Sequence, residues 1–393
     1  MNSDDHIPRM SRPDSAGMTR FVLIWGFLGL LFTAGCTTSG DSPGGGGQEG
    51  PVAATISGTI KVGTAPSGVA VDPTANKIYV TNFGNVQSPA SPCASTDDSV
   101  TIIDGATVST STIADGIGFE SKNPLALAVD SANHRVYVIV QVNTGSIQWP
   151  YPCDSSFKPS YLAVVSGTTF TLAGFPVGLG GLRGIGVDAL TNEIYVGYVN
   201  PNTGAPSPEV VAAINGSSNA IASWVTLGGA PAALAVNPAT NKTYVALAGE
   251  IDVIDGATNS LTKVADVSAV GRNVLAVNPS TNTIYMANSQ SGNLSVIDGE
   301  TDSITATIAL GTTPSGVDVD PQTNFIYVAN AGNSQSGDPG NVTVIDGTTN
   351  ATTTLSDPNA KNPVAIVVNP VTNKIYVANS GSNNVTVIEG AHD

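Results

Sequence analysis

Three ionisable residues stand at related places in a chain that repeats itself, and together they could bind a polar ligand. Asp318 occupies a position that is small or apolar in six other copies of the repeat, and Arg183 and Arg272 precede the equivalent position in two of those copies. A carboxylate beside two guanidinium groups can recognise a polar molecule, but it can equally form an ion pair that only stabilises the fold. The residue types alone leave both interpretations open.

Histidine-dependent chemistry has little support in this chain. His6 lies in a segment that we expect to be removed, His134 lies in a predicted turn, and His392 is the last residue but one. A Ser-His-Asp or Cys-His catalytic system needs a buried, oriented histidine, and zinc or copper sites usually need several. We therefore predict no catalytic residue and no metal site. Calcium held by oxygen ligands alone stays open, through carboxylates such as Asp97 and Asp98.

Two cysteines, Cys93 and Cys153, predict one disulfide bond. Both lie in insertions of neighbouring repeats, at similar distances from the repeated tyrosine, and an exported chain with an even number of thiols usually pairs them. Closing a loop of this size would stabilise the fold by about 4 kcal/mol in the chain-entropy model. Free thiols and metal ligation are the alternatives, although no third metal ligand is evident.

Aromatic residues cluster in one of these insertions. Trp149 and Tyr151 flank Pro150 within residues 141–159, in a chain with only 6% aromatic residues. Aromatic side chains held by proline and a disulfide can stack on a sugar ring or anchor a protein partner. The alternative is that they pack the insertion onto the body of the protein.

The N-terminal segment predicts export and a lipid anchor. Residues 21–35 form an apolar run behind basic residues, too short to span a bilayer comfortably, and Thr-Ala-Gly leads into Cys36. This ending resembles the bacterial lipobox, whose cysteine is acylated after cleavage; an ordinary secretory signal is the alternative. We expect a lipoprotein-type signal peptide at 1–35. A flexible Gly/Ser/Pro tether at 36–53 would then hold a single domain, 54–393, near a membrane, in the periplasm or on the cell surface.

The acidic balance argues against one class of partner. The chain has 14 basic and 30 acidic residues, a net charge of −16, and such a surface repels nucleic acid and anionic lipid. We expect a monomer that binds no nucleic acid.

A repeated phrase supplies the framework that must position these residues. The tyrosine of the Ile-Tyr-Val element recurs at Tyr79, Tyr137, Tyr195, Tyr244, Tyr285, Tyr327 and Tyr376. The spacings of 58, 58, 49, 41, 42 and 49 residues indicate a unit of about 41 residues that carries insertions in some copies.

Each copy predicts four short strands. In the first copy the first three strands are residues 68–71, 77–81 and 99–103. The fourth strand is Thr-rich, as in residues 305–309 of the fifth copy. An Asp/Asn-Pro-x-Thr-Asn turn joins the first two strands, and its last asparagine tolerates left-handed dihedrals. A glycine follows the third strand in all seven copies, and we expect it to adopt positive φ.

The two ends of the repeated region complement each other. The last copy stops after its third strand, at 385–388, whereas residues 54–62 precede the first copy and read as an isolated fourth strand. Pairing them would close a ring and leave no open edge. The sequence therefore predicts an all-β, seven-bladed β-propeller of four-stranded antiparallel blades, closed by an N-terminal strand that completes the last blade.

The Ile-Tyr-Val-Ala-Asn and Val-Thr-Val-Ile-Asp-Gly elements resemble the YVTN β-propeller repeat of YncE-like exported bacterial proteins, over residues 54–390. The resemblance implies the fold and export but not a function, because propellers support many chemistries. Some relatives bind single-stranded DNA, which the acidic composition argues against here.

The insertions point to one face of the ring. The long segments 82–98, 141–159, 200–208 and 331–340 all fall between a second and a third strand, and copies 4, 5 and 7 are short there. Long loops on a rigid scaffold commonly recognise ligands. We therefore favour a non-catalytic cell-envelope lipoprotein that binds a protein or glycan through this face of blades 1–3. A metal-dependent lactonase or other hydrolase with its site at the central channel mouth, or a structural role in a surface layer, are the alternatives.

Overall fold

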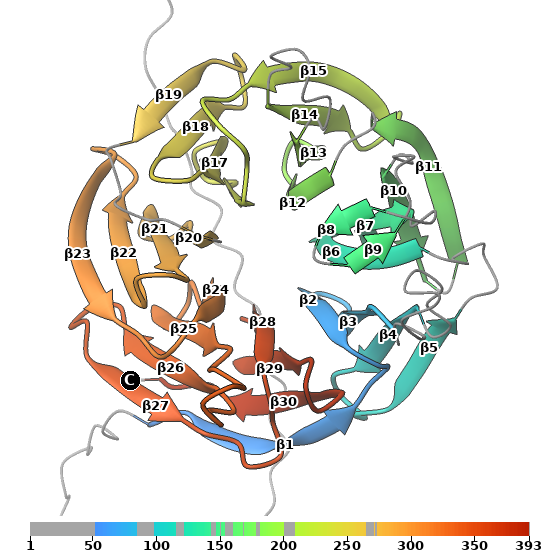
Figure 1. The fold of residues 1–393 in the computed structure, drawn as a ribbon. Helices are drawn as coiled ribbons and strands as arrows, with labels where there is room; N and C mark the ends of the chain where they lie inside the picture. The colour runs from blue at the N-terminus through green and yellow to red at the C-terminus, as the bar shows by residue number, and fades with distance from the viewer. Residues whose placement is uncertain are drawn as a thin grey trace, which may run out of the picture. The chain divides into compact units, whose positions relative to one another are not determined.

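The computed structural model describes residues 52–84, 98–114, 122–142, 147–149, 151–153, 160–167, 169–177, 181–199, 209–264, 271 and 273–392. They form thirty strands joined by turns. These residues contain no helix of the length and apolarity needed to cross a membrane. Seven antiparallel sheets of four strands each are arranged as blades of a ring (Figure 1), which confirms the predicted seven-bladed β-propeller.

Blades 1–3 follow one another along the chain. Blade 1 contains β2 (Pro66–Asp72), β3 (Lys77–Asn82), β4 (Ser99–Asp104) and β5 (Thr110–Ala114). Blade 2 contains β6 (Lys122–Asp130), β7 (Arg135–Val142), β10 (Ser160–Ser166) and β11 (Thr169–Val177). Blade 3 contains β12 (Gly181–Asp188), β13 (Glu193–Val199), β14 (Val210–Asn215) and β15 (Ala220–Thr226).

Blades 4–6 repeat the same order. Blade 4 contains β16 (Ala233–Asn237), β17 (Lys242–Ala246), β18 (Ile251–Asp255) and β19 (Leu261–Val264). Blade 5 contains β20 (Asn273–Asn278), β21 (Thr283–Asn288), β22 (Asn293–Asp298) and β23 (Ser303–Ala309). Blade 6 contains β24 (Pro314–Val319), β25 (Phe325–Asn330), β26 (Asn341–Asp346) and β27 (Thr352–Leu355).

Blade 7 joins the two ends of the ring, as predicted. It contains β28 (Pro363–Asn369), β29 (Lys374–Asn379) and β30 (Asn384–Glu389), and the N-terminal strand β1 (Thr55–Lys61) pairs with β30 as the outermost strand (Figure 1). Val52 and His392 extend this pairing, since each backbone N–H donates to the other residue's carbonyl, at 2.7 and 3.1 Å. Backbone pairing between the chain ends therefore closes the ring.

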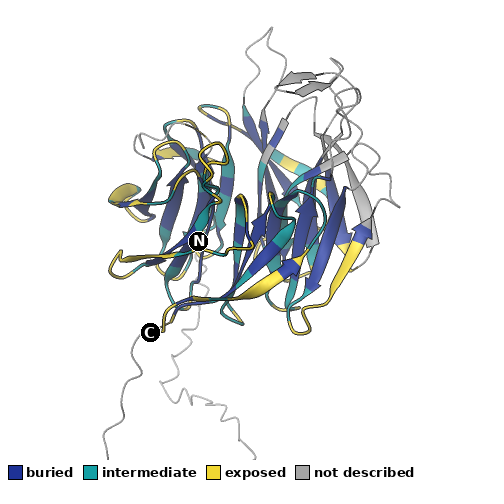
Figure 2. Ribbon diagram, turned by 60° about the horizontal axis from the view of Figure 1, so that its bottom comes forward, coloured by how far each residue is buried: buried dark blue, intermediate teal, exposed yellow. Residues whose placement is uncertain are grey.

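The hydrophobic core lies between the sheets. One apolar cluster joins Tyr137 of blade 2 to Ile185 of blade 3, and another joins Tyr285 of blade 5 to Val317 of blade 6. The middle strands of each blade are buried on both faces, whereas outer strands such as β23 expose most of their residues (Figure 2). Each sheet is thus covered by its neighbours, which explains why the inner strands read as nearly continuous apolar runs.

The first turn of six blades has the predicted left-handed asparagine, and in blade 2 His134 takes this place with a φ of 51°. The φ angle is 49° at Asn76, 52° at Asn282 and 49° at Asn373. Asparagine adopts this geometry at low cost because its side chain bonds nearby backbone groups.

The glycine after the third strand does not have the predicted positive φ angle in most blades. Of the seven glycines, only Gly167 has positive φ, and in blade 5 the positive angle falls on Asp302 instead, at 51°. The Gly299 N–H donates to the Asn282 carbonyl at 2.9 Å, and a Cβ on Gly299 would lie 2.6 Å from Asn282 Oδ1. The prediction of positive φ is therefore wrong for six copies. Glycine recurs because the two turns of a blade contact each other.

Those two turns lie on one end of the ring, which we call the turn face. Because the strands alternate in direction, the connections between second and third strands lie on the other end, the insertion-bearing face. In blade 6 this connection is an ordered loop in which Asn333 and Asp338 exchange backbone hydrogen bonds of 3.1 and 3.0 Å. Most of the insertions in blades 1–3 lies outside the described residues.

Candidate functional site

One carboxylate departs from the apolar pattern of the inner strands. In every blade the first strand pairs one residue with the repeated tyrosine, and Asp318 occupies this position in β24, opposite Tyr327. Its counterparts are Ala70, Ala128, Gly186, Ala235, Ala276 and Val367. Since the position is filled six times by a residue without charge, the blade itself does not require Asp318.

Backbone amides hold the Asp318 carboxylate. The N–H of Val319 donates to its Oδ1 at 2.9 Å, and the N–H of Val368, on the inner strand of blade 7, donates to its Oδ2 at 2.8 Å. Burial raises the pKa of the Asp318 carboxyl to about 6; the two hydrogen bonds act against this rise, and the charge of Asp320 adds to it. Asp318 therefore links blade 6 to blade 7, and its carboxyl has a pKa above that of an ordinary aspartate.

The predicted grouping of Asp318 with two arginines stays a prediction. Arg183 lies in β12 where its pairing with β13 is irregular, between Leu182 and Ile185, and its side chain is not among those described. Arg272 lies outside the described residues.

A small hairpin stands in the insertion of blade 2. Strand β8 (Ile147–Trp149) pairs with β9 (Tyr151–Cys153), and Trp149 is placed opposite Tyr151 at its tip. The predicted aromatic pair thus shares one hairpin on the insertion-bearing face, although its side chains are not described. Cys153 is the last residue of β9 and Cys93 lies outside the described residues, so the disulfide stays a prediction.

The described part of the chain brings together no three His, Cys, Asp or Glu side chains that could hold a metal ion. Asp98 is buried there, whereas Asp97 lies outside it. Calcium binding in the insertions stays a hypothesis from the sequence.

A ring of polar links on the turn face was not predicted. The last residue of each first strand, or the residue directly after it in blade 6, is a buried Asp or Asn, namely Asp72, Asp130, Asp188, Asn237, Asn278, Asp320 and Asn369. The amides of Asn237, Asn278 and Asn369 each donate to the turn asparagine of the following blade, at 2.8, 2.8 and 3.0 Å. The turn motif therefore ties neighbouring blades together, which the sequence of one repeat could not show.

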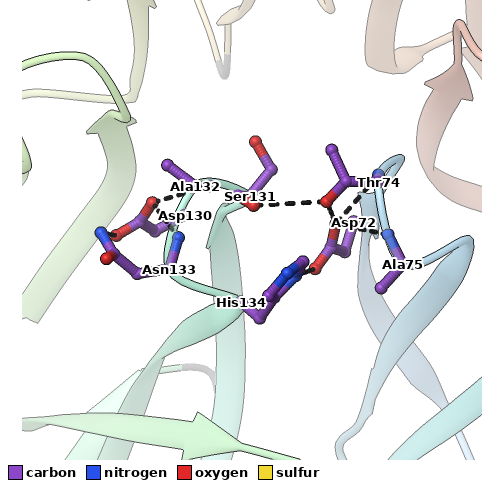
Figure 3. A network of polar contacts seen from close by, with 8 residues as sticks. All are labelled: Asp72, Thr74, Ala75, Asp130, Ser131, Ala132, Asn133 and His134. Carbon is purple, nitrogen blue, oxygen red and sulfur yellow. Dashed lines mark hydrogen bonds and ion pairs between the residues drawn. The ribbon is translucent and has the colours of Figure 1, made fainter.

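His134 replaces the turn asparagine in blade 2, and its Nδ1 lies 2.7 Å from Asp72 Oδ2 of blade 1 (Figure 3). Burial acts to raise the pKa of Asp72, but hydrogen bonds from Thr74, His134 and Ala75 together hold it below its ordinary value. The Thr74 hydroxyl donates to Asp72 Oδ1 at 2.6 Å, and its oxygen lies 3.3 Å from the Ser131 carbonyl oxygen of blade 2. The presence of histidine in one of seven turns was the signal in the sequence, and its role here is structural.

A scan against models of known protein families finds no match to this chain, and a search among curated proteins finds none either. The assignment to the propeller fold rests on the seven sheets and their closure.

Proposed function

We propose that this protein is a non-catalytic binding propeller of the bacterial cell envelope, related to the YVTN repeat proteins and held at a membrane by a lipid on Cys36. It would recognise a protein or glycan through the insertion-bearing face of blades 1–3. The lipobox-like ending before Cys36 and the tether at 36–53 support the anchor.

The uneven distribution of long connections carries this proposal. Connections on the turn face are tight and alike from blade to blade, whereas those between second and third strands differ greatly in length. They span five or fewer residues in blades 4, 5 and 7 and sixteen in blade 1, between Asn82 and Ser99. A rigid ring with variable loops on one side is typical of proteins that bind through those loops.

The aromatic hairpin gives the sharpest test. Replacing both Trp149 and Tyr151 by alanine should reduce capture of the partner, from envelope fractions or an array of envelope glycans, by at least tenfold, since buried aromatic anchors dominate such interfaces. Trp224→Ala is the matched control, because Trp224 is 50% exposed on the outer strand β15 and lies outside the hairpin. Capture that survives the double change, or falls equally with the control, would reject this surface.

A Cys93–Cys153 bond would staple the insertions of blades 1 and 2 and hold that hairpin in place. Peptide mapping without reductant should recover the two cysteines in one cross-linked peptide. Reduction should then weaken capture of the partner without unfolding the ring.

A hydrolase is the second candidate, and the raised pKa of Asp318 is the observation that favours it, because catalytic carboxyls often have perturbed pKa values. A lactone panel and a metal analysis of the purified protein test it. Asp318→Ala should abolish any hydrolysis found; absence of both metal and hydrolysis would dismiss this candidate.

A further inference from the structure

A hollow of about 300 Å³ lies between blade 5 and blade 6 on the turn face. Blade 5 contributes Thr283, Asp298 and Thr305, and blade 6 contributes Asn324 and Gly347. Its volume is at the lower end of the range for small-molecule sites. It lies on the end of the ring opposite the insertions, so it is independent of the function proposed above.

The hollow exists because one residue of the repeat is short. The first residue of the second strand is long or bulky in six blades, where it is Lys77, Arg135, Glu193, Lys242, Phe325 or Lys374. In blade 5 it is Thr283. A side chain that would occupy the space between the blades is therefore missing at this one place.

Two of the longer side chains show what such a residue does. Arg135 Nη1 of blade 2 donates to the Gly216 carbonyl of blade 3 at 2.8 Å, and Lys242 Nζ of blade 4 donates to the Gly299 carbonyl of blade 5 at 3.3 Å. Each crosses to the glycine that follows the third strand of the next blade. The equivalent glycine for blade 5 is Gly347, which lines the hollow.

The hollow is also lined by a carboxylate, that of Asp298, with no lysine or arginine opposite it. Thr283 pairs with Asp298 on the neighbouring strand. At the same place in blade 4, Lys242 pairs with Asp255. In blade 7 Lys374 pairs with Glu389, and its Nζ lies 3.2 Å from Glu389 Oε1. Asp298 Oδ1 accepts two backbone N–H groups of its own hairpin, as Asp255 Oδ1 does in blade 4.

The pKa of Asp298 is lowered by the N–H groups of Thr301 and Glu300, so this carboxylate is ionised at neutral pH. In Asp255 the hydrogen bonds from Thr258 lower the pKa most, and the charge of Lys242 adds to them. No such cation acts on Asp298 among the described residues.

We propose that this hollow binds a primary ammonium or guanidinium group, which takes the place of the lysine or arginine found in other blades. Its N–H groups would donate to the Gly347 carbonyl and its charge would pair with Asp298, while the hydroxyls of Thr283 and Thr305 accept the remaining donors. The net charge of −16 draws cations toward the protein. The group is carried either by a free amine or by a lysine side chain of a peptide.

The test uses n-butylammonium as a copy of the lysine side chain, titrated into the whole protein in low-salt buffer and followed by ligand-observed NMR. Nα-acetyl-lysine methylamide tests a peptide-borne lysine, and n-butanol tests the same chain without charge. We expect both amines to bind at least tenfold more tightly than n-butanol. The tighter of the two amines identifies the source.

Two variants locate the site. Thr283→Lys supplies a tethered ammonium, so it should reduce butylammonium binding at least tenfold and raise the unfolding temperature. Asp298→Asn should weaken binding at least fivefold while keeping the hairpin, because Asn215 accepts the corresponding backbone N–H groups in blade 3, at 3.1 and 2.9 Å. Asp104→Asn removes the same charge from blade 1 as a matched control.

Three results would overturn the proposal. Equal binding of n-butanol and n-butylammonium would show that charge plays no part. Unchanged binding to Thr283→Lys would place the amine elsewhere. Equal weakening by Asp104→Asn and Asp298→Asn would reduce the effect to general attraction by an acidic surface.

Discussion

Replacing Asp318 by alanine should change how the stability of the ring depends on pH. Alanine occupies the equivalent position in four other blades, so the substitution fits the fold. Burial raises the pKa of Asp318 from 3.8 to about 6, and at about 1.4 kcal/mol per pKa unit this corresponds to about 3 kcal/mol. That amount is a large share of the stability of an ordinary domain.

The sign follows from proton binding. Because the pKa of Asp318 is higher in the folded state, the folded protein holds this proton more tightly than the unfolded chain does. Its contribution therefore favours folding at pH 4 and becomes less favourable as pH rises to 6 and slightly above. Beyond that, the ionised carboxylate remains buried and the contribution stays constant.

Urea unfolding followed by circular dichroism between pH 4 and 8 measures this effect. The free energy of unfolding of the wild type minus that of Asp318→Ala should fall by about 2.5 kcal/mol between pH 4 and pH 7.5, because part of the full effect appears only below pH 4. Asp318→Asn is the control of equal shape and should show the same pH trend as the alanine variant. A difference that stays constant within about 0.5 kcal/mol across this range would refute the account of a buried carboxyl.

Three further changes test other parts of the fold. Gly299→Ala should lower the free energy of unfolding by about 1–3 kcal/mol in urea titrations, whereas Gly58→Ala, with nothing within 4 Å of the added Cβ, should have no measurable effect of this kind. His134→Asn should keep a link to blade 1, because the asparagine amide can donate to the Asp72 carboxylate, and should leave the unfolding temperature nearly unchanged. His134→Ala should cost about 1 kcal/mol, and this cost should disappear as pH falls through the lowered pKa of Asp72. Cys36→Ser should move the protein from the detergent phase to the aqueous phase in a phase-separation assay; equal partitioning of both forms would contradict the lipid anchor.

The fold could be predicted from the sequence because every copy repeats the same strand and turn patterns. The turn asparagine, the β-branched runs and the isolated strand at 54–62 all agree on a closed ring, and Asn282 with its left-handed φ is one confirmed example. The role of Gly299 could not be predicted, because a close approach between two turns looks the same in the sequence as a positive φ. The links between blades, such as Asn278 to Asn324, were also missed, since they join residues of different copies.

The candidate sites were harder to predict than the fold, for a physical reason. A departure from the repeat attracts attention only when the departing residue carries chemistry, as Asp318 does. Thr283 is chemically unremarkable, and its significance is the space beside it and the Asp298 carboxylate opposite it, which has no lysine partner among the described residues. A sequence shows which residue is present, but it does not show that a contact between two blades is missing.

The three residues that depart from the repeat differ in whether they bond to a neighbouring blade. His134 replaces an asparagine but bonds the blade next to it, and Asp318 replaces an alanine but accepts an amide of blade 7. The fold bonds both of them to a neighbouring blade. Thr283 gains no partner in the next blade: the Gly347 carbonyl and the Asp298 carboxylate, the counterparts of groups that bind lysine or arginine elsewhere, stay beside an open hollow. Because a ligand that binds only the folded state stabilises it, an amine bound at the junction of blades 5 and 6 would raise the stability of the ring.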